Sequence, residues 1–567
     1  MRKRLEWRGL APDRMPNVRT LHSKAVALIR EHCTRLSLNP TVRPLSELEA
    51  KLLVQDVAAD LADRNVRMSF KGQGSVPSYL RAYRAEQGGA GVPPWISQDG
   101  ELLRRYREFA DTYESLQKFY SALDWFRVVK LVLQLFDSYP DILTEEQAST
   151  DHLLVDEYQD LNRNEQEFIR RLVRDPSGLC IVGDEDQSIY ETQRFADPGG
   201  IITFDVQYPG STTLPLTYCH RCPTKVIAKA NALIEKNTRR IQGKAPLQAM
   251  HPDRTGVVAT VLHRSMKAET EWLVRKVKEL PGKGCLYKDV LILFGDGTIA
   301  EDYVKALRKD NVPLDVKLRI AGPFDSPCFL SVMAVLRFLV HQSDNLAVRQ
   351  CLDNWPQIGA ITIRALRKHA VQAGVSLWQA VASVAQNLNG SPSIPRRRSV
   401  EQFHTAMSQL LSIQEFHRIV PAIRAMLQDC ADDPGVQIVN EYLASRTGQE
   451  SLLNLADVLQ SFELEREQGK FESEEEERED KVRVMTMHSS KGLEAKVVFL
   501  PALEDDLMPG EVQNLEERHR LFFVSITRSK QVLCLTWAKQ RTGQAIHRLG
   551  GRMLGKKRSR FLDDMGA

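Results

Sequence analysis

The sequence of 567 residues has no long hydrophobic run that could cross a membrane. Its basic start, MRKRLEWRGLAPDR, is not followed by an apolar segment, and its most apolar stretch, CFLSVMAVLRFLV, is short and interrupted by Arg337. A signal peptide or a membrane-spanning helix needs a longer uninterrupted apolar segment. We therefore predict a cytoplasmic protein with no membrane partner, in which CFLSVMAVLRFLV forms a buried helix.

Cysteines are few, and their spacing gives no disulfide framework. The nine cysteines are scattered, and several lie in apolar, strand-like runs, such as Cys180 and Cys534. This distribution predicts reduced thiols in the core. Cys219 and Cys222 form a CxxC pair, but a zinc site needs a second pair of ligands at suitable spacing. We therefore expect two packed thiols and no structural metal.

The sequence also has little excess of one charge sign, since its net charge is only +4. Lys and Arg cluster at both ends, from Arg2 to Arg30 and from Lys539 to Arg560. Such clusters could attract phosphates, but on charge alone solvated tails are the better interpretation. The length, with 43% hydrophobic and 26% charged residues, predicts a soluble protein of about three or four domains.

Five short apolar runs end in acidic or polar residues, and we expect them to be β-strands. They are HLLVDEYQD, LCIVGDEDQ, DVLILF, KVVFLPALEDD and QVLCLTWA. Near-continuous apolarity predicts burial on both faces, as in parallel α/β sheets, which bind ligands at the carboxyl ends of their strands. The charged residues that follow these strands are therefore the candidates for chemistry.

The spacing of the strands predicts the domain organisation. Residues 24–147 and 326–470 have a mainly helical pattern, and the second stretch interrupts the strands like an insertion. The acidic run ESEEEERED is expected to be the linker that returns to the second sheet domain. The predicted segments are 1–147, 148–213, 214–325, 326–480 and 481–567.

Two loops carry candidates for nucleotide chemistry. Adjacent acids that close a buried strand are costly unless a cation meets them, and Mg²⁺ is a natural partner for Asp156 and Glu157. In nucleotide hydrolysis one carboxylate holds Mg²⁺ and a second activates water, which assigns Asp156 to the metal and Glu157 to the base. In the next loop the amide of Gln187 could sense a γ-phosphate. Taken singly, each motif is explained better by a helix cap or a polar turn.

Two arginines are candidates for neutralising phosphate charge. Arg221 lies in YCHRCP and Arg528 in LFFVSITRSKQVL. A guanidinium that reaches across a cleft can stabilise a transferred phosphoryl group. Isolated arginines are mostly salt-bridged surface residues, so the neighbouring motifs must decide between the two interpretations.

Five motifs in order resemble motifs II to VI of the UvrD/Rep family of superfamily 1 DNA helicases: HLLVDEYQD, IVGDEDQSIY, CHRCPTKVIAKANALI, VRVMTMHSSKGLE and EERHRLFFVSITRS. VRTLHS at 18–23 and Leu123-Asp124-Trp125 resemble further family segments, so the resemblance covers residues 18–562. It implies an α/β fold of the P-loop NTPase helicase type. Two RecA-like parallel-sheet domains, an incomplete 1A and a 2A, would carry mainly helical insertions, 1B and 2B.

The resemblance also implies residue roles. Asp156 would bind Mg²⁺, Glu157 would be the base, Gln187 the γ-phosphate sensor, and Arg221 and Arg528 the arginine fingers. His220 stands in place of the adenine-stacking tyrosine, and Gly492 and Glu494 fall at the nucleotide, with Glu494 at the ribose contact. Phe195 either replaces a base-stacking ring of the family or is a core residue. The positions that correspond to DNA contacts are Thr20, His22, Ser23, Phe195, Thr486 and His488.

The family's Walker A sequence, GxxxxGK[ST], is not found among the 567 residues. The nearest match, Gly550–Lys557, continues into a basic tail and follows no apolar strand. We predict an ATP- and Mg²⁺-dependent helicase or translocase, acting 3′ to 5′ on single-stranded DNA or a single-stranded tail in repair or recombination, and inactive as an isolated chain. The alternatives are a non-hydrolysing DNA-binding or regulatory protein, and one subunit of a split helicase whose second polypeptide supplies Walker A.

Overall fold

The computed structural model divides into two compact units. Unit 1 contains Met1–Ser149, Glu167–Leu172 and Ala321–Phe471, and unit 2 contains Thr150–Gln166, Val173–Ile320 and Glu472–Ala567. The structure describes residues 16–318, 324, 326–387, 393–413, 418–419, 421–423, 430, 433–445, 458–459, 462, 479–512, 514–541 and 556–566. The predicted acidic linker, apart from residues 479 and 480, and the Gly550–Gly555 part of the Walker-like match lie outside the described residues.

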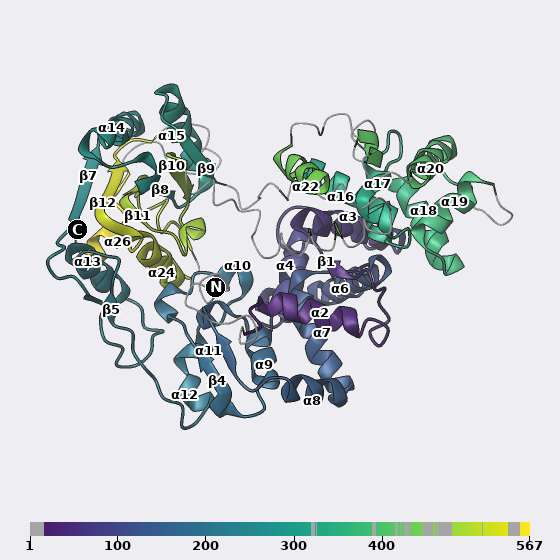
Figure 1. Ribbon diagram of the computed structural model, residues 1–567, viewed down its shortest axis with the longest axis horizontal. Helices are drawn as coiled ribbons and strands as arrows, with labels where there is room; N and C mark the ends of the chain where they lie inside the picture. Colours follow the sequence, from purple (N-terminus) through teal and green to yellow (C-terminus); the bar gives the residue numbers. More distant parts are fainter. Residues whose placement is uncertain are drawn as a thin grey trace. The chain divides into compact units, whose positions relative to one another are not determined.

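A six-stranded, wholly parallel sheet forms the centre of unit 2 (Figure 1). Leu291 of the inner strand β8 lies opposite Arg483 on one side and Val498 on the other. The predicted strands DVLILF, KVVFLPALEDD and QVLCLTWA are confirmed, and three further strands join them. In spatial order the strands are β7 (Val257–His263), β12 (Ser529–Ala538), β11 (Ala495–Leu500), β8 (Val290–Phe294), β10 (Val482–Thr486) and β9 (Leu314–Lys317).

Helices cover both faces of this sheet, because alternate side chains of each strand point to opposite faces. Leu291 and Leu293 share a core with α13 (Thr224–Ile234), α24 (Leu515–Ile526) and α26 (Arg560–Asp564). Val290, Ile292 and Phe294 share a second core with α14 (Met266–Glu279) and α15 (Gly297–Lys309). The predicted α/β class with buried parallel strands is therefore confirmed for this sheet.

A second parallel sheet of unit 2 has only two strands, β3 (Leu153–Val155) and β4 (Leu179–Ile181). Both were predicted as strands, but their predicted burial on both faces is wrong: Leu154 is 75% exposed and Cys180 is exposed. The reason is that, among the described residues, each strand pairs only with the other. Cys180 is therefore not a core thiol, whereas Cys534 in β12 is buried as predicted.

Short elements complete unit 2. β5 (Tyr218–Cys219) and β6 (Gln248–Ala249) form a third parallel pair. β5 precedes α13 in the chain, and β6 follows it. Around β3 and β4 the chain forms α9 (Arg163–Leu172), α10 (Glu191–Arg194), α11 (Gly199–Ile202) and α12 (Phe204–Gln207). The C-terminal part of α9, Glu167–Leu172, falls in unit 1.

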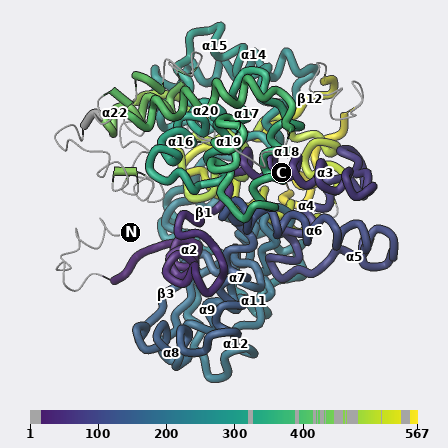
Figure 2. The backbone as a smooth tube through the Cα atoms, turned by 90° about the vertical axis from the view of Figure 1, so that its right-hand side faces the viewer, coloured from purple at the N-terminus to yellow at the C-terminus, as the bar shows by residue number. Residues whose placement is uncertain are grey.

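Unit 1 is helical, as expected for residues 24–147 and 326–470, and Figure 2 shows α16 to α20 gathered in one group. CFLSVMAVLRFLV forms the buried helix α16, as predicted. The short strands β1 (Arg43–Pro44) and β2 (Ala122–Leu123) pair in parallel. The helices are α2 (Leu21–Glu31), α3 (Glu47–Asp63), α4 (Val76–Gln87), α5 (Pro94–Ser97), α6 (Gly100–Tyr120), α7 (Trp125–Ser138), α8 (Pro140–Ala148), α16 (Pro327–Val340), α17 (Asn345–Asp353), α18 (Ala360–Ala373), α19 (Leu377–Ala385), α20 (Arg397–Leu411) and α22 (Pro434–Ser445).

Buried ion pairs join the two helical segments of unit 1. Arg349 of α17, which is 1% exposed, lies 3.2 Å from Asp56 of α3, and Arg367 of α18 lies 3.1 Å from the same carboxylate. Nearby, burial opposes ionisation of Glu49, but Arg43 outweighs it and lowers the pKa of Glu49 to about 2. These pairs supply the partners that buried charges require.

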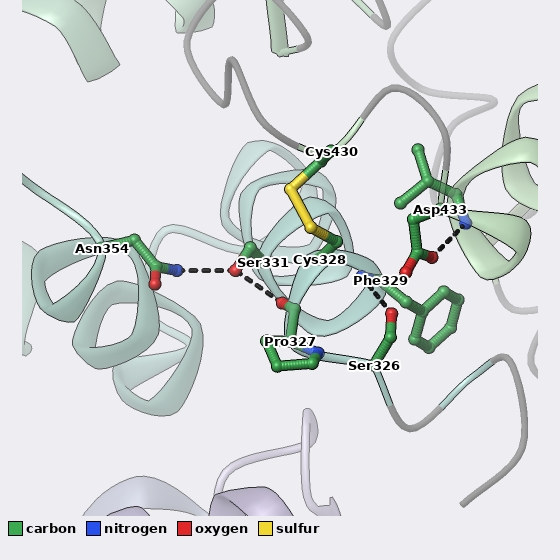
Figure 3. Close-up of a disulfide and its surroundings, with 9 residues drawn as sticks. Ser326, Pro327, Cys328, Phe329, Ser331, Asn354, Cys430 and Asp433 are labelled. Carbon is green, nitrogen blue, oxygen red and sulfur yellow. Dashed lines mark hydrogen bonds between the residues drawn. A yellow bond between two sulfur atoms is a disulfide. The ribbon is translucent and has the colours of Figure 1, made fainter.

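A disulfide joins Cys328 in the first turn of α16 to Cys430, 102 residues later (Figure 3). The prediction that all cysteines are reduced is therefore wrong. The contact could not be read from spacing, because the sequence does not reveal which distant cysteines pair. The same turn is capped by Ser326, whose Oγ accepts the Phe329 amide at 3.0 Å.

The basic C-terminal segment is partly folded into the core, so its interpretation as a solvated tail is wrong for the described residues. Phe561 and Leu562 of α26 are fully buried. Arg541 is fully buried between Glu269 and Glu504, at 2.6 and 2.7 Å. Among the described residues, no helix is both long and apolar enough to cross a membrane.

Candidate functional site

Asp156 and Glu157 lie directly after β3 in unit 2, and both side chains are exposed. Glu157 has a left-handed backbone, with φ +53°, and its amide donates to Asp156 Oδ1 at 2.9 Å. Lys491 Nζ lies 3.3 Å from Glu157 Oε2. The predicted cost of burying these two acids is therefore absent, and the chain itself provides a cation beside them.

Gln187 lies in the loop after β4, at the end of a short 3₁₀ turn, Glu185–Gln187. Its side-chain amide donates to Asp184 Oδ2 at 2.8 Å, and its backbone carbonyl accepts from Lys491 Nζ at 3.0 Å. The buried Gln159 ties this loop to the preceding one: its Nε2 donates to Glu157 at 2.5 Å, and its Oε1 accepts the Asp184 amide at 2.9 Å. The acidic loop and the glutamine loop are thus held together.

Two cations between α13 and β6 hold the acids of the Gln187 loop. Lys244 Nζ lies 2.5 Å from Asp184, 3.0 Å from Glu185 and 2.9 Å from Asp186. Arg240 binds both oxygens of Asp186, at 2.8 and 2.7 Å. Burial opposes ionisation of Asp184, but the charge and hydrogen bond of Lys244 outweigh it and lower the pKa of Asp184. Asp184, which accepts the Gln187 side-chain amide, is therefore ionised, and the acids around Gln187 are held by cations.

Arg221 lies in the turn between β5 and α13. Its Nε donates to Glu494 Oε2 at 3.0 Å, and its Nη1 donates to the carbonyl oxygen of Thr527 at 3.3 Å. Glu494 also pairs with Lys530. The hydrogen bond with Lys530, followed by that with Arg221, lowers the pKa of Glu494. The predicted ribose contact and one predicted arginine finger are thus in direct contact.

Arg528 follows α24 and is only 3% exposed. Its Nε donates to the Val524 carbonyl at 2.8 Å, and its Nη1 donates to the Leu493 carbonyl at 3.2 Å. Burial and the nearby charge of Arg221 lower the pKa of Arg528 to about 10, while the charge of Glu157 opposes that shift. Arg221, Arg528 and the Glu157 carboxylate therefore lie close enough to influence one another.

A cavity of about 860 Å³ opens beside Arg221. Four cationic side chains line it, together with His220 and Glu494: Arg221, Arg254, Lys496 and Lys530. Its volume falls in the range typical of small-ligand sites, and its cations suit a polyanion such as a nucleotide. Gly492 has φ +83°, a backbone conformation that favours glycine, before Glu494 in the same loop.

The predicted DNA-contact residues fall in both units. In unit 1 Thr20 caps α2 by accepting the Ser23 amide at 3.1 Å, and the ring of His22 stacks on Trp125 with centroids 4.5 Å apart. In unit 2 Thr486 Oγ1 lies 2.9 Å from Ser489 Oγ at the end of β10. Burial, and then the charge of Arg518, lower the pKa of His488 to about 4, so its ring is neutral at pH 7. Phe195 is half-buried at the end of α10, with φ +58°.

Comparison with known proteins identifies the family. The model of the UvrD/REP helicase N-terminal domain matches residues 1–209, and that of the UvrD-like helicase C-terminal domain matches residues 214–391 and 434–540. The chain belongs to the UvrD/Rep helicase family. It is 26% identical over 568 residues to the ATP-dependent DNA helicase Rep of Buchnera aphidicola, covering 95% of this chain and 85% of that protein. It is 25% identical over 587 residues to the ATP-dependent DNA helicase PcrA of Bacillus subtilis, covering 97% and 75%.

The residues present fit the Mg²⁺ ion that this helicase family implies. Among the described residues, no group of three or more His, Cys, Asp or Glu side chains is arranged to hold a metal. Mg²⁺ in nucleotide sites is commonly held by one or two carboxylates, with phosphate and water oxygens as its other ligands. The exposed carboxylate of Asp156, at the carboxyl end of a parallel strand, matches that type of site.

Several residues that connect the helicase motifs were not predicted from the sequence. Lys491 joins the loops after β3 and β4, Gln159 bridges the same loops, and Lys244 holds the acids of the second loop. Lys491 and Gln159 both lie inside quoted motifs, SSKGLE and DEYQD. Asking which cation balances the adjacent acids would have identified Lys491 as a candidate.

Proposed function

We propose that this chain is the motor of an ATP- and Mg²⁺-dependent helicase that moves 3′ to 5′ along single-stranded DNA or a single-stranded tail. The observation that carries this proposal is the contact of Arg221 with Glu494 and with the Thr527 carbonyl, next to Arg528, at a cationic cavity in unit 2. The direction and a role in repair or recombination follow from the family resemblance. The Rep and PcrA relatives, which are named as ATP-dependent DNA helicases, support the same activity.

The geometry suggests how the side chains would divide the work. Glu157 would orient the attacking water and accept its proton, while Gln159 and Lys491 hold the carboxylate in place. Arg221 and Arg528 would neutralise charge that develops on the transferred phosphoryl group. Gln187 would exchange its hydrogen bond with Asp184 for one with the γ-phosphate. Mg²⁺ held by Asp156 would neutralise the charge of the phosphate oxygens.

The isolated chain is expected to hydrolyse ATP poorly, because no GxxxxGK[ST] sequence occurs among the 567 residues. We propose that a polypeptide segment carrying this loop completes the site. The apolar surface of the β3–β4 sheet supports this idea, since Leu154 is 75% and Val182 49% exposed. A parallel sheet is normally covered on both faces, so these side chains suit contact with an added strand or helix.

The test supplies a family N-terminal segment with GxxxxGK[ST], fused or as a separate polypeptide, and measures ATP hydrolysis with and without single-stranded DNA. We expect DNA-stimulated turnover to appear, and Glu157→Gln to reduce it by about 100-fold or more, because the base is lost while the polar shape remains. Glu279→Gln, at the exposed end of α14, is the matched control and should turn over like the parent.

Three results would contradict these assignments. Robust DNA-stimulated turnover by the unfused chain would show that no additional phosphate loop is needed. A completed protein in which Glu157→Gln hydrolyses ATP as fast as its parent would exclude Glu157 as the base. A completed protein that binds DNA and ATP but never hydrolyses ATP would favour the regulatory, non-hydrolysing alternative.

DNA binding by the isolated chain should survive without hydrolysis, because phosphate contacts spread over several segments need no nucleotide. Affinity for single-stranded DNA should fall steeply as salt rises, since each neutralised phosphate releases counterions. Fluorescence anisotropy over a series of salt concentrations measures this slope. Affinity that is independent of salt would contradict a backbone-binding mode.

A further inference from the structure

Two cysteines bracket the predicted adenine and phosphate contacts. β5 ends at Cys219, α13 begins at Thr224, and His220, Arg221 and Cys222 lie in the turn between them. The Cys222 amide donates to Cys219 Sγ at 3.4 Å, and the Cys222 thiol donates to the Thr527 carbonyl at 3.1 Å. Cys219 lines the cavity of about 860 Å³, whereas Cys222 is buried. Cys219 therefore borders the cavity, and Cys222 lies in the buried core.

The two sulfurs differ in chemistry. The proximity of the Cys222 side chain, helped by the backbone amides of Cys222 and Arg221 and by the charge of Arg221, lowers the pKa of Cys219 to about 5, although burial opposes the shift. The same proximity, together with burial, raises the pKa of Cys222. Cys219 is thus a thiolate at neutral pH, the form that reacts with oxidants, and Cys222 is a protonated thiol beside it.

We infer that Cys219 and Cys222 form a reversible redox pair, which hydrogen peroxide closes to a disulfide across His220 and Arg221. The inference stands on the direct contact between the two residues and on the opening of Cys219 to the cavity. A strand that ends in CxxC before a helix is an arrangement known to support thiol and disulfide exchange. Zinc is a poorer occupant, because the described residues offer no third ligand to these two sulfurs.

The oxidation balances with one peroxide molecule. The Cys219 thiolate attacks one peroxide oxygen, the O–O bond breaks, and sulfenic acid and hydroxide form; hydroxide takes a proton and becomes water. The Cys222 sulfur then attacks the Cys219 sulfur, the S–O bond breaks, and the departing hydroxide takes the Cys222 proton. Overall, two thiols are oxidised to one disulfide, and peroxide is reduced to two waters.

Closure of the disulfide has a consequence that rests on the proposed function. It removes the Cys222 hydrogen bond to Thr527, whose carbonyl also accepts from Arg221. Arg221, which lies between the two cysteines and pairs with Glu494, must move with them. We expect oxidation to weaken ATP binding at this cavity, and a thiol reductant to restore it.

Peptide mapping tests the redox pair directly. Trypsin cleaves after Arg194, Arg221 and Lys225, so Cys219 and Cys222 fall in separate peptides, 195–221 and 222–225. The full chain is treated with hydrogen peroxide, its remaining thiols are alkylated, and the digest is analysed by mass spectrometry. We expect the two peptides to be joined, two hydrogen masses below their sum, and to separate on reduction. Failure of peroxide to join them would overturn the inference.

Internal and mutant controls sharpen the result. Cys180, an exposed thiol in β4, lies in peptide 175–194 and should not be joined to either peptide. Equal joining of Cys180 would mean unselective oxidation and would also overturn the inference. In Cys222→Ser, Cys219 should stop at sulfenic acid, which a β-diketone reagent traps. In Cys219→Ser, Cys222 should give no sulfenic acid; comparable trapping there would contradict the assignment of Cys219 as the attacking sulfur.

ATP binding is measured separately on the reduced and the oxidised chain, each completed with the GxxxxGK[ST] segment, with a fluorescent ATP analogue. Weaker binding after oxidation, reversed by reductant and absent in Cys222→Ser, supports the regulatory consequence. Equal binding by joined and reduced chains would overturn that consequence. If the reduced chain binds no ATP, the proposed nucleotide site fails, whereas the joined peptides still decide whether the redox pair exists.

Discussion

The two larger parallel sheets of unit 2 are built from similar apolar runs and differ in burial. All five residues of β8 are buried between two helical layers, whereas Leu154 of β3 is 75% exposed. Leu-rich runs thus specify strands in both sheets. Burial depends on the neighbouring strands and helices, which lie elsewhere in the chain. An exposed apolar strand therefore marks where the described protein offers a surface for contact.

The largest expected effect lies just after β12 of the covered sheet, at Arg541. Arg541→Ala would leave the buried carboxylates of Glu269 and Glu504 without their arginine, which costs about 3–5 kcal/mol for buried pairs. Urea unfolding followed by circular dichroism measures the loss. Arg560→Ala is the control, since Arg560 is half-exposed beside Asp505 and should cost less than about 1 kcal/mol. Equal losses would contradict the importance of burial here.

The next effect compares one strand from each sheet. Ile292→Ala in β8 should lower the free energy of unfolding by about 2–5 kcal/mol, because it leaves a cavity in a core that is fully buried. Leu154→Ala in β3 should change it by less than about 0.5 kcal/mol, because little apolar surface is buried there. The same urea titrations apply. Similar losses at both positions would mean that Leu154 is covered in solution.

Acid titration should separate the two sheet regions. The folded-state pKa of His488, near β10, is about 4, below its reference of 6.5, so its contribution to stability is complete above pH 6.5 and is lost as pH falls toward 4. Burial raises the pKa of Glu165, in α9 beside β3, from 4.5 to about 7, so its contribution is complete below pH 4.5 and is lost as pH rises toward 7. Between pH 4.5 and 6.5 the two effects oppose each other.

Two substitutions test these opposite dependences of the unfolding free energy on pH. Relative to the parent, His488→Asn should gain about 1.4 kcal/mol per pH unit as the pH falls from 6.5 to 4.5, and Glu165→Gln should gain similarly as it rises over the same range. Unfolding free energies at pH 4.5, 5.5 and 6.5 provide the measurement. Variants whose difference from the parent stays constant with pH would contradict the shifted pKa values.

The smallest effect on stability is expected at the uncovered sheet. Val182→Lys, at a side chain that is 49% exposed, should change the unfolding free energy by less than about 0.5 kcal/mol. The same charge should prevent a separately supplied N-terminal segment from restoring ATP hydrolysis, because it would be buried in the apolar contact. Restoration equal to that of the parent would show that the segment docks elsewhere.

Local patterns predicted much of the fold. The strands β3, β4, β8, β11 and β12 and the helix α16 follow from apolar runs. β9 and β10 were not predicted as strands, because LDVK and VRVMT carry charged residues. In β10, the Arg483 side chain donates to the Glu494 carbonyl at 2.8 Å. Burial of β3 and β4 was mispredicted because it depends on distant elements. The Cys328–Cys430 disulfide was not predicted for the same reason, since its cysteines are 102 residues apart.

The candidate site shows the same division. Motifs identified Asp156, Glu157, Gln187, Arg221 and Arg528, whose roles stay predictions, but gave no contacts between them. Lys491 and Asp160 are 331 residues apart in the sequence, and Arg221 and Thr527 are 306 apart. Pairing over such distances depends on how the strands are ordered in the sheet, which no single motif encodes.

Lys491 concentrates several of these contacts in a single ammonium group. Its Nζ lies 2.5 Å from Asp160, 3.0 Å from the Gln187 carbonyl and 3.3 Å from Glu157. A displacement of about 1 Å in the segment between β10 and β11 would therefore alter the loops after β3 and β4 together, since charged hydrogen bonds weaken as their atoms separate. Acetylation of this amine would remove the positive charge of Lys491. All three partners would then lose the same cation at once.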